Sequence, residues 1–305
     1  MIGNRVIFFL FDGVHLLDFA GAAQVFYEAG TYGVPYGLRF VSISTHPGSS
    51  AGISFASLEP PAAVTVTATD IVMVPGMDLQ RWNREEDHLW MKWLQDAAAA
   101  GATVCTVCTG AFALAAAGML DGKECTTHWK YTGRLQQEYP RLKVDESRLF
   151  VKSGNIYTSA GIATGIDLAL YLMEERHGAA FACQLAKELV VYIRRDGNAP
   201  QHSIYLQNRQ HVNYQVHQVQ DYIIHHLHQK LPVTTLAEQV YMSPRNLTRL
   251  FKAATGLTIG QYTENLRREK ARRLLQSSHK VAWVAKECGF NSPNQLRRIL
   301  GRMPA

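Results

Sequence analysis

Two kinds of hydrophobic pattern alternate along the first two thirds of the chain. Short runs that are almost wholly apolar lie at 6–11, 38–44, 71–76 and 102–107. Such runs are typical of strands buried on both faces of a sheet. Patterns of helical period separate them, at 18–29, 85–100 and 165–177. This βαβ rhythm predicts a doubly wound α/β sandwich around a parallel sheet.

The pattern changes around Arg195. The stretch RRDGNAPQHS (194–203) is polar and rich in turn-forming residues, which favours a linker. Beyond it, apolar residues recur at helical spacing and no strand-like run follows. The first of them are Val212, Val216, Val219, Ile223 and Leu227. We therefore expect an α/β domain at 1–196, a linker at 197–211 and an all-α domain at 212–305.

Length and charge support two domains with different partners. A chain of 305 residues exceeds what one hydrophobic core usually organises. Residues 199–305 carry 15 Lys and Arg against 5 Asp and Glu, whereas residues 1–198 carry 16 against 20. A charge of +10 in the last third indicates that this part alone meets a polyanion; a solvated basic face is the alternative.

The sequence gives no sign of export or of a membrane span. The N-terminal MIGNRVIFFLFDG contains a short apolar run that meets Asp12, which is typical of a buried strand and not of a secretory signal. No apolar stretch reaches the ~18 residues that a membrane span needs. Five cysteines spread along the chain disfavour a disulfide framework. We expect a cytoplasmic protein.

One phrase occurs twice in the last third, as SPRNLTRLF at 243–251 and SPNQLRRIL at 292–300. Ser followed by Pro favours a helix start, because Ser caps free N–H groups and Pro at the first helical position loses no hydrogen bond. Upstream, Thr235-Leu-Ala-Glu238 has the spacing of a capping box, and 281–287 repeats that short helix. Two helix-turn-helix units are predicted.

Each repeated helix has an apolar face and a polar face. Leu247, Leu250 and Phe251 form the first apolar face, and Leu296, Ile299 and Leu300 the second. Arg, Asn and Gln suit bidentate contacts with guanine and adenine in the major groove. The candidate DNA-contacting residues are Arg245, Asn246, Thr248, Arg249, Asn294, Gln295, Arg297 and Arg298. Helical hairpins in a protein-binding module are the alternative, which the duplication, the Ser-Pro caps and the charge disfavour.

Residues from about 212 onward resemble the AraC/XylS-type DNA-binding domain, through LAEQVYMSPRNLTRLFKAATGLTIGQY and VAKECGFNSPNQLRRIL. The resemblance implies that a long helix at about 259–275 places both recognition helices in successive major grooves, ~34 Å apart. After Leu300 the sequence continues only as GRMPA, without a counterpart of KAATGLTIGQY. We expect the second unit to be less stable or more weakly bound to DNA.

Cys108 follows a predicted strand in ATVCTVCTGAF. Cys105 lies inside that strand, so alternation predicts that the two thiols point to different sides, unlike a redox pair at a helix start. Strand, Cys108, Thr109-Gly110 and then a helix at 111–117 have the outline of a nucleophile elbow, whose helix N-terminus favours a thiolate or an anion.

This segment, together with FDGVHLLDFAG, VMVPGM, TTHW and SAGIATGIDLAL, resembles the ThiJ/PfpI (class I glutamine amidotransferase-like) superfamily over about 4–195. The resemblance implies a flavodoxin-like fold with Cys108 at the elbow and Asp18 approaching it. It also implies that Gly76 and Thr109 present backbone N–H groups to the pocket. With Gly110 in the turn and His128 in TTHW, these are the expected pocket residues. Thr109 stands where peptidase-like members carry His, which disfavours peptidase chemistry.

The order of the two domains resembles GlxA-type transcriptional regulators. It implies a non-enzymatic, sequence-specific regulator that senses a small, nitrogenous metabolite such as an amino acid or a quaternary amine. Expected partners are double-stranded DNA, the effector, a second copy of the chain in a homodimer and, as a candidate, RNA polymerase. We expect no cofactor. Residues three apart in His225-His-Leu-His228 share a helix face, but they lack acidic or Cys partners, so no metal site is expected.

Two alternatives remain at this point. A cysteine-dependent hydratase or amide hydrolase would use Cys108 and Asp18 as catalytic groups and keep the helical domain as an accessory. A nonspecific nucleoid-type binder would bind all sequences equally, with a steep dependence on salt. Such a binder does not need two recognition helices.

Overall fold

The computed structural model of the chain describes residues 4–82, 89–191, 195, 197–198, 201, 208–209, 211–276 and 280–301. Contacts divide the chain into two compact units, Met1–Gln201 and His202–Ala305, each of which is described by itself. The expected linker at 197–211 lies partly outside the described residues, so its boundaries stay a prediction.

The first unit contains one large sheet, whose strand order is β2-β1-β3-β4-β8-β7. Its strands are β1 (Arg5–Phe9), β2 (Gly37–Val41), β3 (Ile71–Val74), β4 (Thr103–Val107), β7 (Phe150–Ser153) and β8 (Ile156–Ser159). All neighbours pair in parallel except β7 with β8. The four strands expected from the apolar runs are confirmed, and the antiparallel β7–β8 hairpin is an addition. Two short strands, β5 (Glu124–Cys125) and β6 (Lys143–Val144), pair separately.

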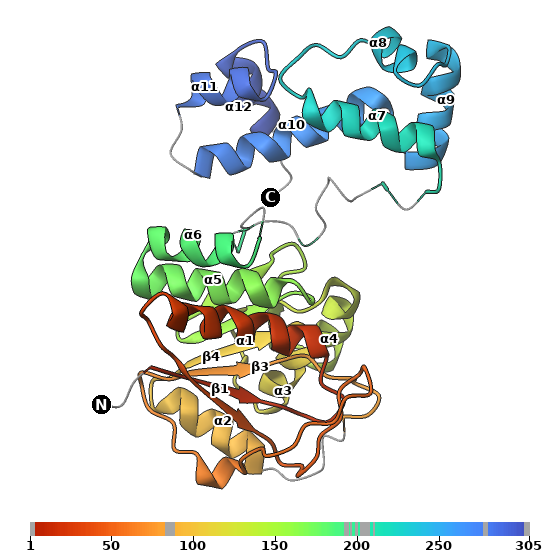
Figure 1. The fold of residues 1–305 in the computed structure, drawn as a ribbon. Helices are drawn as coiled ribbons and strands as arrows, with labels where there is room; N and C mark the ends of the chain where they lie inside the picture. Colours follow the sequence, from red (N-terminus) through yellow and green to blue (C-terminus); the bar gives the residue numbers. More distant parts are fainter. Residues whose placement is uncertain are drawn as a thin grey trace. The chain divides into compact units, whose positions relative to one another are not determined.

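Helices cover both faces of the sheet, as expected for a doubly wound fold. Strand alternation sends Ile7 and Phe9 into one apolar cluster and Val6 and Phe8 into the other. The first cluster includes residues of α2 (Leu89–Ala99), α3 (Ala111–Ala116) and α4 (Thr132–Glu138). The second includes residues of α1 (Leu16–Thr31), α5 (Thr164–His177) and α6 (Ala179–Glu188), and Figure 1 shows these three helices together on one side of the sheet.

Most predicted helix boundaries in the first unit are within two residues of those observed. The predicted helix at 85–100 corresponds to α2, and its first part lies outside the described residues. Short 3₁₀ turns occur as η1 (Pro61–Ala63), η2 (Cys108–Gly110) and η3 (Trp129–Tyr131). η2 joins β4 directly to α3, which produces the expected strand-to-helix turn at Cys108.

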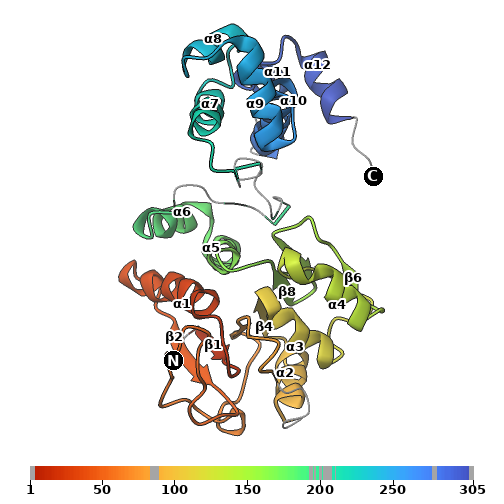
Figure 2. The ribbon, with the colours of Figure 1, turned by 90° about the vertical axis from the view of Figure 1, so that its right-hand side faces the viewer.

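The described part of the second unit is all helical, as predicted. Figure 2 shows its helices α7 (Tyr214–His225), α8 (Val233–Glu238), α9 (Pro244–Thr255), α10 (Ile259–Gln276), α11 (Val281–Glu287) and α12 (Pro293–Leu300). The expectation that Val212 belongs to the apolar face of the first helix is wrong. Asn213 caps α7 by accepting a hydrogen bond from the N–H of Val216 at 3.0 Å, so Val212 precedes the helix and is exposed.

The second unit has two separate apolar clusters that share one helix. α7, α8, α9 and the first half of α10 enclose one cluster, to which α10 contributes Tyr262 and Leu266. α11, α12 and the second half of α10 enclose the other, to which α10 contributes Ala271. An 18-residue α-helix is about 27 Å long, so α10 is long enough to separate the two clusters.

None of the described helices combines the length and the apolar character that a membrane crossing requires.

Candidate ligand pocket and nucleic-acid interface

Cys108 lies at a sharp turn immediately after β4. Its backbone has a φ of 55°, a left-handed conformation that L-residues rarely adopt. The turn is held by its own N–H, which donates to Ala160 O at 2.8 Å, and by its carbonyl, which accepts from Thr127 Oγ1 at 2.7 Å. At Gly110 a Cβ would lie 2.2 Å from Val74 O, so only glycine fits there. The elbow geometry predicted for Cys108-Thr109-Gly110 is present.

The carboxyl ends of the parallel strands bring other predicted pocket residues to Cys108, as such ends do in open α/β sheets. Gly76 follows β3, and its N–H donates to Asp18 Oδ2 at 3.2 Å. A Cβ on Gly76 would lie 2.3 Å from that oxygen and 2.9 Å from Cys108 Cβ. Thr109 Oγ1 donates to Met77 O at 2.7 Å and accepts from Met77 N at 2.8 Å. The structure therefore brings Asp18, Gly76, Cys108 and Thr109 together.

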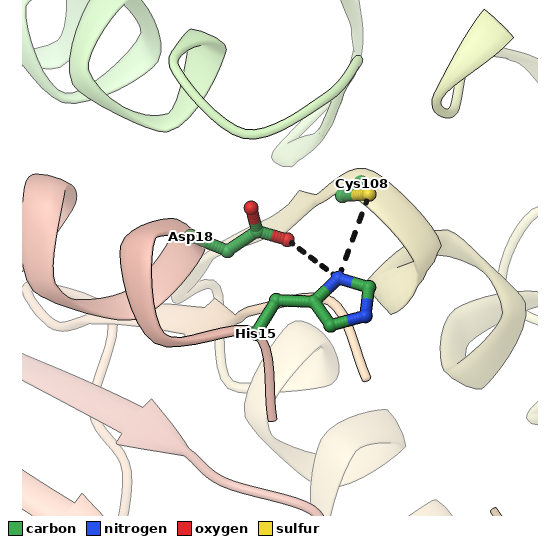
Figure 3. Close-up of side chains that lie close together, drawn as sticks. All are labelled: His15, Asp18 and Cys108. Atoms are coloured by element: carbon green, nitrogen blue, oxygen red, sulfur yellow. Dashed lines mark hydrogen bonds and ion pairs between the residues drawn. The ribbon is translucent and has the colours of Figure 1, made fainter. Parts of the chain in front are cut away.

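A residue that the sequence analysis did not propose completes this group. His15 lies between β1 and α1, and its Nδ1 is 3.9 Å from Cys108 Sγ and 3.6 Å from Asp18 Oδ2 (Figure 3). The His15 side chain is 28% exposed, whereas Asp18 is fully buried. His15 precedes Asp18 by three residues, so the helix start places both on one side. That spacing was the only available signal.

His128 lies beside the loop after β8. A Cβ on Gly161 would be 2.1 Å from the His128 ring, so this glycine allows the ring to approach the loop after β8. His128 Nδ1 accepts a hydrogen bond from the N–H of Lys130 at 3.2 Å. The next residue in the loop, Ile162, directs its N–H toward the sulfur of Cys108. His128 therefore belongs to the same region without joining His15, Asp18 and Cys108.

The surroundings of Cys108 favour a protonated thiol. Burial, and then the Asp18 carboxylate, raise the pKa of Cys108 well above its ordinary value. The N–H groups of Thr109 and Ile162 lower that pKa by a smaller amount. An activated nucleophile needs the opposite shift, so these groups alone do not make Cys108 a strong nucleophile.

The predicted opposite orientation of Cys105 and Cys108 is wrong. Both cysteines pack in the same apolar cluster, because the positive φ of Cys108 ends the strand alternation before its side chain is placed. Both thiols are nevertheless free and buried, and burial raises the pKa of Cys105 as well. The pair therefore lacks the exposed, acidic thiol of a redox Cys-x-x-Cys.

The repeated Ser-Pro phrase starts α9 and α12. Ser243 Oγ accepts from the N–H of Asn246 at 3.3 Å, and Ser292 Oγ accepts from that of Gln295 at 3.1 Å. The predicted capping box at Thr235 is wrong, because α8 begins at Val233 with Pro232 as its N-cap. Both repeated helices thus begin where the phrase predicts.

The polar faces of α9 and α12 carry the eight candidate DNA-contacting residues. All are exposed except Gln295, which is half-buried and accepts from the N–H of Asn291 through its side-chain oxygen at 2.7 Å. An Arg contacts an Asn in both helices: Arg249 donates to Asn246 at 3.1 Å and Arg297 to Asn294 at 3.2 Å. Leu247, Phe251, Leu296 and Ile299 are buried on the opposite faces.

Close backbone contacts connect the two helix-turn-helix units. Arg267 of α10 donates to the carbonyls of Leu227 and Gln229 at 2.9 and 2.5 Å. Gly289, in the turn before α12, has a φ of 71°, and a Cβ there would lie 2.3 Å from Leu227 O. The turn before α12 therefore packs directly against the backbone of the first helix-turn-helix unit, near Leu227. This contact fixes the relative placement of α9 and α12.

The fold and the pocket define a class: a flavodoxin-like α/β domain with an elbow cysteine, followed by paired helix-turn-helix units. Residues 4–175 match the family model described as DJ-1/PfpI family, and residues 236–303 match one described as a helix-turn-helix domain. The chain belongs to the DJ-1/PfpI family and carries an additional helix-turn-helix domain.

Several curated proteins are similar to this chain. It is 34% identical over 210 residues to the HTH-type transcriptional regulator CdhR of Pseudomonas aeruginosa, which covers 68% of this chain and 62% of that protein. It is 30% identical over 203 residues to the HTH-type transcriptional regulator GlxA of Rhizobium meliloti, covering 65% and 62%. An isonitrile hydratase of Pseudomonas putida is 38% identical over 110 residues, covering 36% and 46%. The chain thus spans less than two thirds of the length of each of these three relatives.

A solved structure shows the same fold. The AraC family transcriptional regulator from Pseudomonas putida superposes with a TM-score of 0.53 at 22% identity, covering 61% of this chain and 99% of that one.

Proposed function

We propose that this protein is a sequence-specific DNA-binding transcriptional regulator whose DJ-1/PfpI-family domain binds a small effector. The observation that carries this proposal is the pair of Ser-capped helices, α9 and α12, which expose Arg and Asn side chains and are joined through α10. Its similarity to curated regulators over two thirds of its length supports the same function.

In this proposal α9 and α12 enter successive major grooves on one face of the DNA. Arg245, Asn246 and Arg249 are exposed on α9, and Asn294, Arg297 and Arg298 on α12, where they can reach base edges. Thr248 donates to Pro244 O at 2.8 Å, and the side-chain oxygen of Gln295 is held by Asn291, so these two residues have less freedom to contact bases. The charge of +10 in the last third supplies the phosphate contacts.

Replacing one Arg in each recognition helix tests the DNA-binding assignment. A binding sequence is first selected from a random DNA pool with the wild-type chain. Arg249→Ala and Arg298→Ala should each weaken binding to it by about 1 to 3 kcal/mol, because each removes one base contact. Gel-shift titration measures the effect. Arg134→Ala, which removes a surface ion pair with Glu138 in the first unit, should leave affinity unchanged. Unchanged affinity in both recognition-helix variants would refute the assignment.

The effector pocket proposed here is lined by His15, Asp18, Gly76, Cys108 and Thr109, with Gly110 in the turn and His128 on the wall. Its buried carboxylate and its partly exposed imidazole suit a small polar compound, and we propose a nitrogenous metabolite. A thermal-shift screen against amino acids and quaternary amines tests this, since a ligand raises the apparent stability of the state that binds it. Gly76→Ala, which places a methyl group against Asp18 and Cys108, should abolish the shift.

Assembly and location complete the proposal. We propose a homodimer, RNA polymerase as a candidate partner and action in the cytoplasm, where a transcriptional regulator meets its DNA. Sedimentation equilibrium of the full chain tests the homodimer. Ligand binding must favour one arrangement of the protein over another, because equal affinity for both would shift no equilibrium.

A cysteine-dependent hydratase remains the second candidate. The contact between His15 Nδ1 and Cys108 Sγ favours it, as does the identity with an isonitrile hydratase over part of the chain. It predicts hydration of isonitriles that disappears in Cys108→Ala. The raised pKa of Cys108 argues against it.

A further inference from the structure

The three side chains in Figure 3 carry donor atoms of different chemistry. His15, Asp18 and Cys108 each offer one donor atom, and these atoms lie within 4.8 Å of one another. We infer that the three residues bind a borderline-soft divalent cation of the Zn²⁺ type, with a fourth position left for water or for a donor atom of the effector. Imidazole, carboxylate and thiolate are the three side-chain ligands that Zn²⁺ accepts in proteins.

Two of the three distances between donor atoms are close to those of a tetrahedral site. Zn–N and Zn–O bonds of ~2.0 Å and Zn–S bonds of ~2.3 Å, at tetrahedral angles, place neighbouring ligand atoms roughly 3.3 to 3.5 Å apart. His15 Nδ1 is 3.6 Å from Asp18 Oδ2 and 3.9 Å from Cys108 Sγ. For these two pairs, movements of a few tenths of an ångström would reach the tetrahedral separation, and the third pair, Asp18 and Cys108, lies within 4.8 Å. His15 can provide them, because its side chain is partly exposed.

The carboxylate supplies an independent indication of a ligand. Asp18 is fully buried, and its Oδ1 has no hydrogen-bond partner among the described residues. An unsatisfied buried oxygen of a charged group is costly. Its Oδ2 is held by the N–H of Gly76, where the absence of a Cβ lets the backbone approach Asp18 and Cys108 closely. A bound cation would compensate the buried charge of Asp18.

The other histidine-rich segment does not form a comparable group. His225 Nδ1 contacts Asp221 O at 2.7 Å and His226 Nδ1 contacts Tyr222 O at 2.8 Å, both at the C-terminal end of α7. Among the described residues, His15, Asp18 and Cys108 are the one group in which three potential metal ligands lie close together.

Cation binding has a simple proton balance. Cys108 must release its thiol proton to solvent and donate a sulfur lone pair to the metal, as metal-bound cysteines do. The N–H groups of Thr109 and Ile162, which point at the sulfur, would remain as hydrogen-bond donors to the coordinated thiolate. The inference rests on the pocket assigned to the effector under the proposed function, and it needs no DNA.

Cobalt(II) binding by the full-length chain tests the inference. Co²⁺ substitutes for Zn²⁺ in sites of this kind and gives a thiolate-to-metal charge-transfer absorption only when a sulfur is bound. Titration should produce this band with one equivalent of Co²⁺ per chain, and one equivalent of Zn²⁺ should abolish it. Cys108→Ser should lack the band, and His15→Asn should weaken Co²⁺ binding by at least tenfold.

Two matched controls make the result specific. Cys183→Ser removes an exposed thiol, and His128→Asn removes a histidine of the same pocket region; both should retain the band. A chain that gives no charge-transfer band overturns the inference, and so does a band that persists in Cys108→Ser or disappears in Cys183→Ser. If Cys108→Ser fails to fold, the His15→Asn variant provides the test, because His15 is partly exposed. An unchanged Co²⁺ affinity in His15→Asn also overturns the inference. Loss of DNA binding in the recognition-helix variants would leave these outcomes unaffected.

Discussion

At the scale of single residues, conformation and burial decide the chemistry of the pocket. Cys108 occupies a left-handed backbone position at the end of a strand, which turns its thiol toward Asp18 and His15. This backbone conformation places the Cys108 side chain on the same side of the sheet as that of Cys105, contrary to simple strand alternation. Identical side chains in this protein differ in exposure, and this difference can be measured.

Alkylation should distinguish Cys108 from Cys183. Burial and the Asp18 carboxylate raise the pKa of Cys108, so little thiolate is present at pH 7, whereas Cys183 is exposed. Iodoacetamide should modify Cys183 first, and the rate at Cys108 should rise with pH while the fold persists. Mass spectrometry of peptides over time measures both rates. Equal or faster modification of Cys108 at pH 7 would contradict the raised pKa.

Tyr241 is predicted to destabilise the first helix-turn-helix turn. It has a φ of 52° and is 99% exposed, so it bears the cost of a left-handed conformation without burying its ring. Gly289 occupies the corresponding position in the second helix-turn-helix unit. The residue after Tyr241, Met242, donates its N–H to Ala237 O, and the residue after Gly289, Phe290, donates its N–H to Ala285 O in the same way. Tyr241→Gly should raise the free energy of unfolding by about 0.5 to 1 kcal/mol.

Urea denaturation of the full chain measures this change. Tyr214→Gly is the control, because Tyr214 is also largely exposed but begins a regular helix, where glycine is unfavourable. Opposite signs for the two variants are expected. A loss of stability in Tyr241→Gly would show that the tyrosine makes a favourable contribution in its turn.

At the scale of elements, the sequence predicted segments with a strong hydrophobic period and missed those without one. β1, β3 and β4 read RVIFF, IVMV and TVCTV, which are mostly apolar or β-branched and were recognisable. β7 and β8 read FVKS and IYTS, which are half polar. Asp18 and Cys108 were found through their motifs. His15 was missed because its contact with Cys108 depends on how the loop after β1 meets the loop after β4, and the spacing of His15 to Asp18 alone does not reveal that contact.

An ion pair that joins β1 to the segment before β3 should make stability depend on pH. Asp70 is buried and accepts from Arg5 at 2.5 and 2.9 Å and from Thr67 N at 2.7 Å. Burial tends to raise the pKa of Asp70, but these hydrogen bonds lower it overall. The folded-state pKa is therefore below that of the unfolded chain. The stabilisation that ionised Asp70 gives to the folded state is complete above the unfolded-state pKa of ~3.9. It is lost as the pH falls through the folded-state pKa of Asp70.

Asp70→Asn should lower the free energy of unfolding at pH 7 by about 1.5 to 3 kcal/mol, since it replaces charged hydrogen bonds to a buried site. The difference from wild type should shrink as the pH falls below about 4. Denaturation curves at several pH values measure both effects. Asp96→Asn, at an exposed ion pair with Lys92, is the control and should change stability little. A difference that does not vary with pH would contradict the lowered pKa.

At the scale of the whole molecule, charge is divided between the two units. The acidic α/β part and the basic helical part were recognisable from sequence, because net charge and period change near the same residues. Their individual folds follow from local pattern and family motifs. The contacts of Arg267 and Gly289 could not be predicted from the sequence, because they join residues some 40 or more positions apart.

DNA affinity should depend steeply on salt. If the basic unit contacts 6 to 10 phosphates, affinity should fall by roughly 10³ to 10⁵ between 50 and 200 mM salt through counterion release. Fluorescence anisotropy with the selected DNA measures this slope. Lys252→Ala, at the exposed end of α9, should reduce the slope if it contacts phosphate, whereas Lys92→Ala in the first unit should not. A slope near zero would exclude a phosphate-dominated interface.

Because α10 packs in both apolar clusters, it also determines how α12 is rotated relative to α9 about the α10 axis. Tyr262 and Leu266 face one cluster and Ala271 faces the other, so the number of residues between them sets the angle about the α10 axis at which α12 stands to α9. One residue inserted after Arg268 would rotate everything beyond it by about 100° and advance it by about 1.5 Å. Each half could still pack internally, yet α12 would point away from the side of the duplex that α9 reads. The intervening length is therefore under stricter constraint than the identity of the side chains along it.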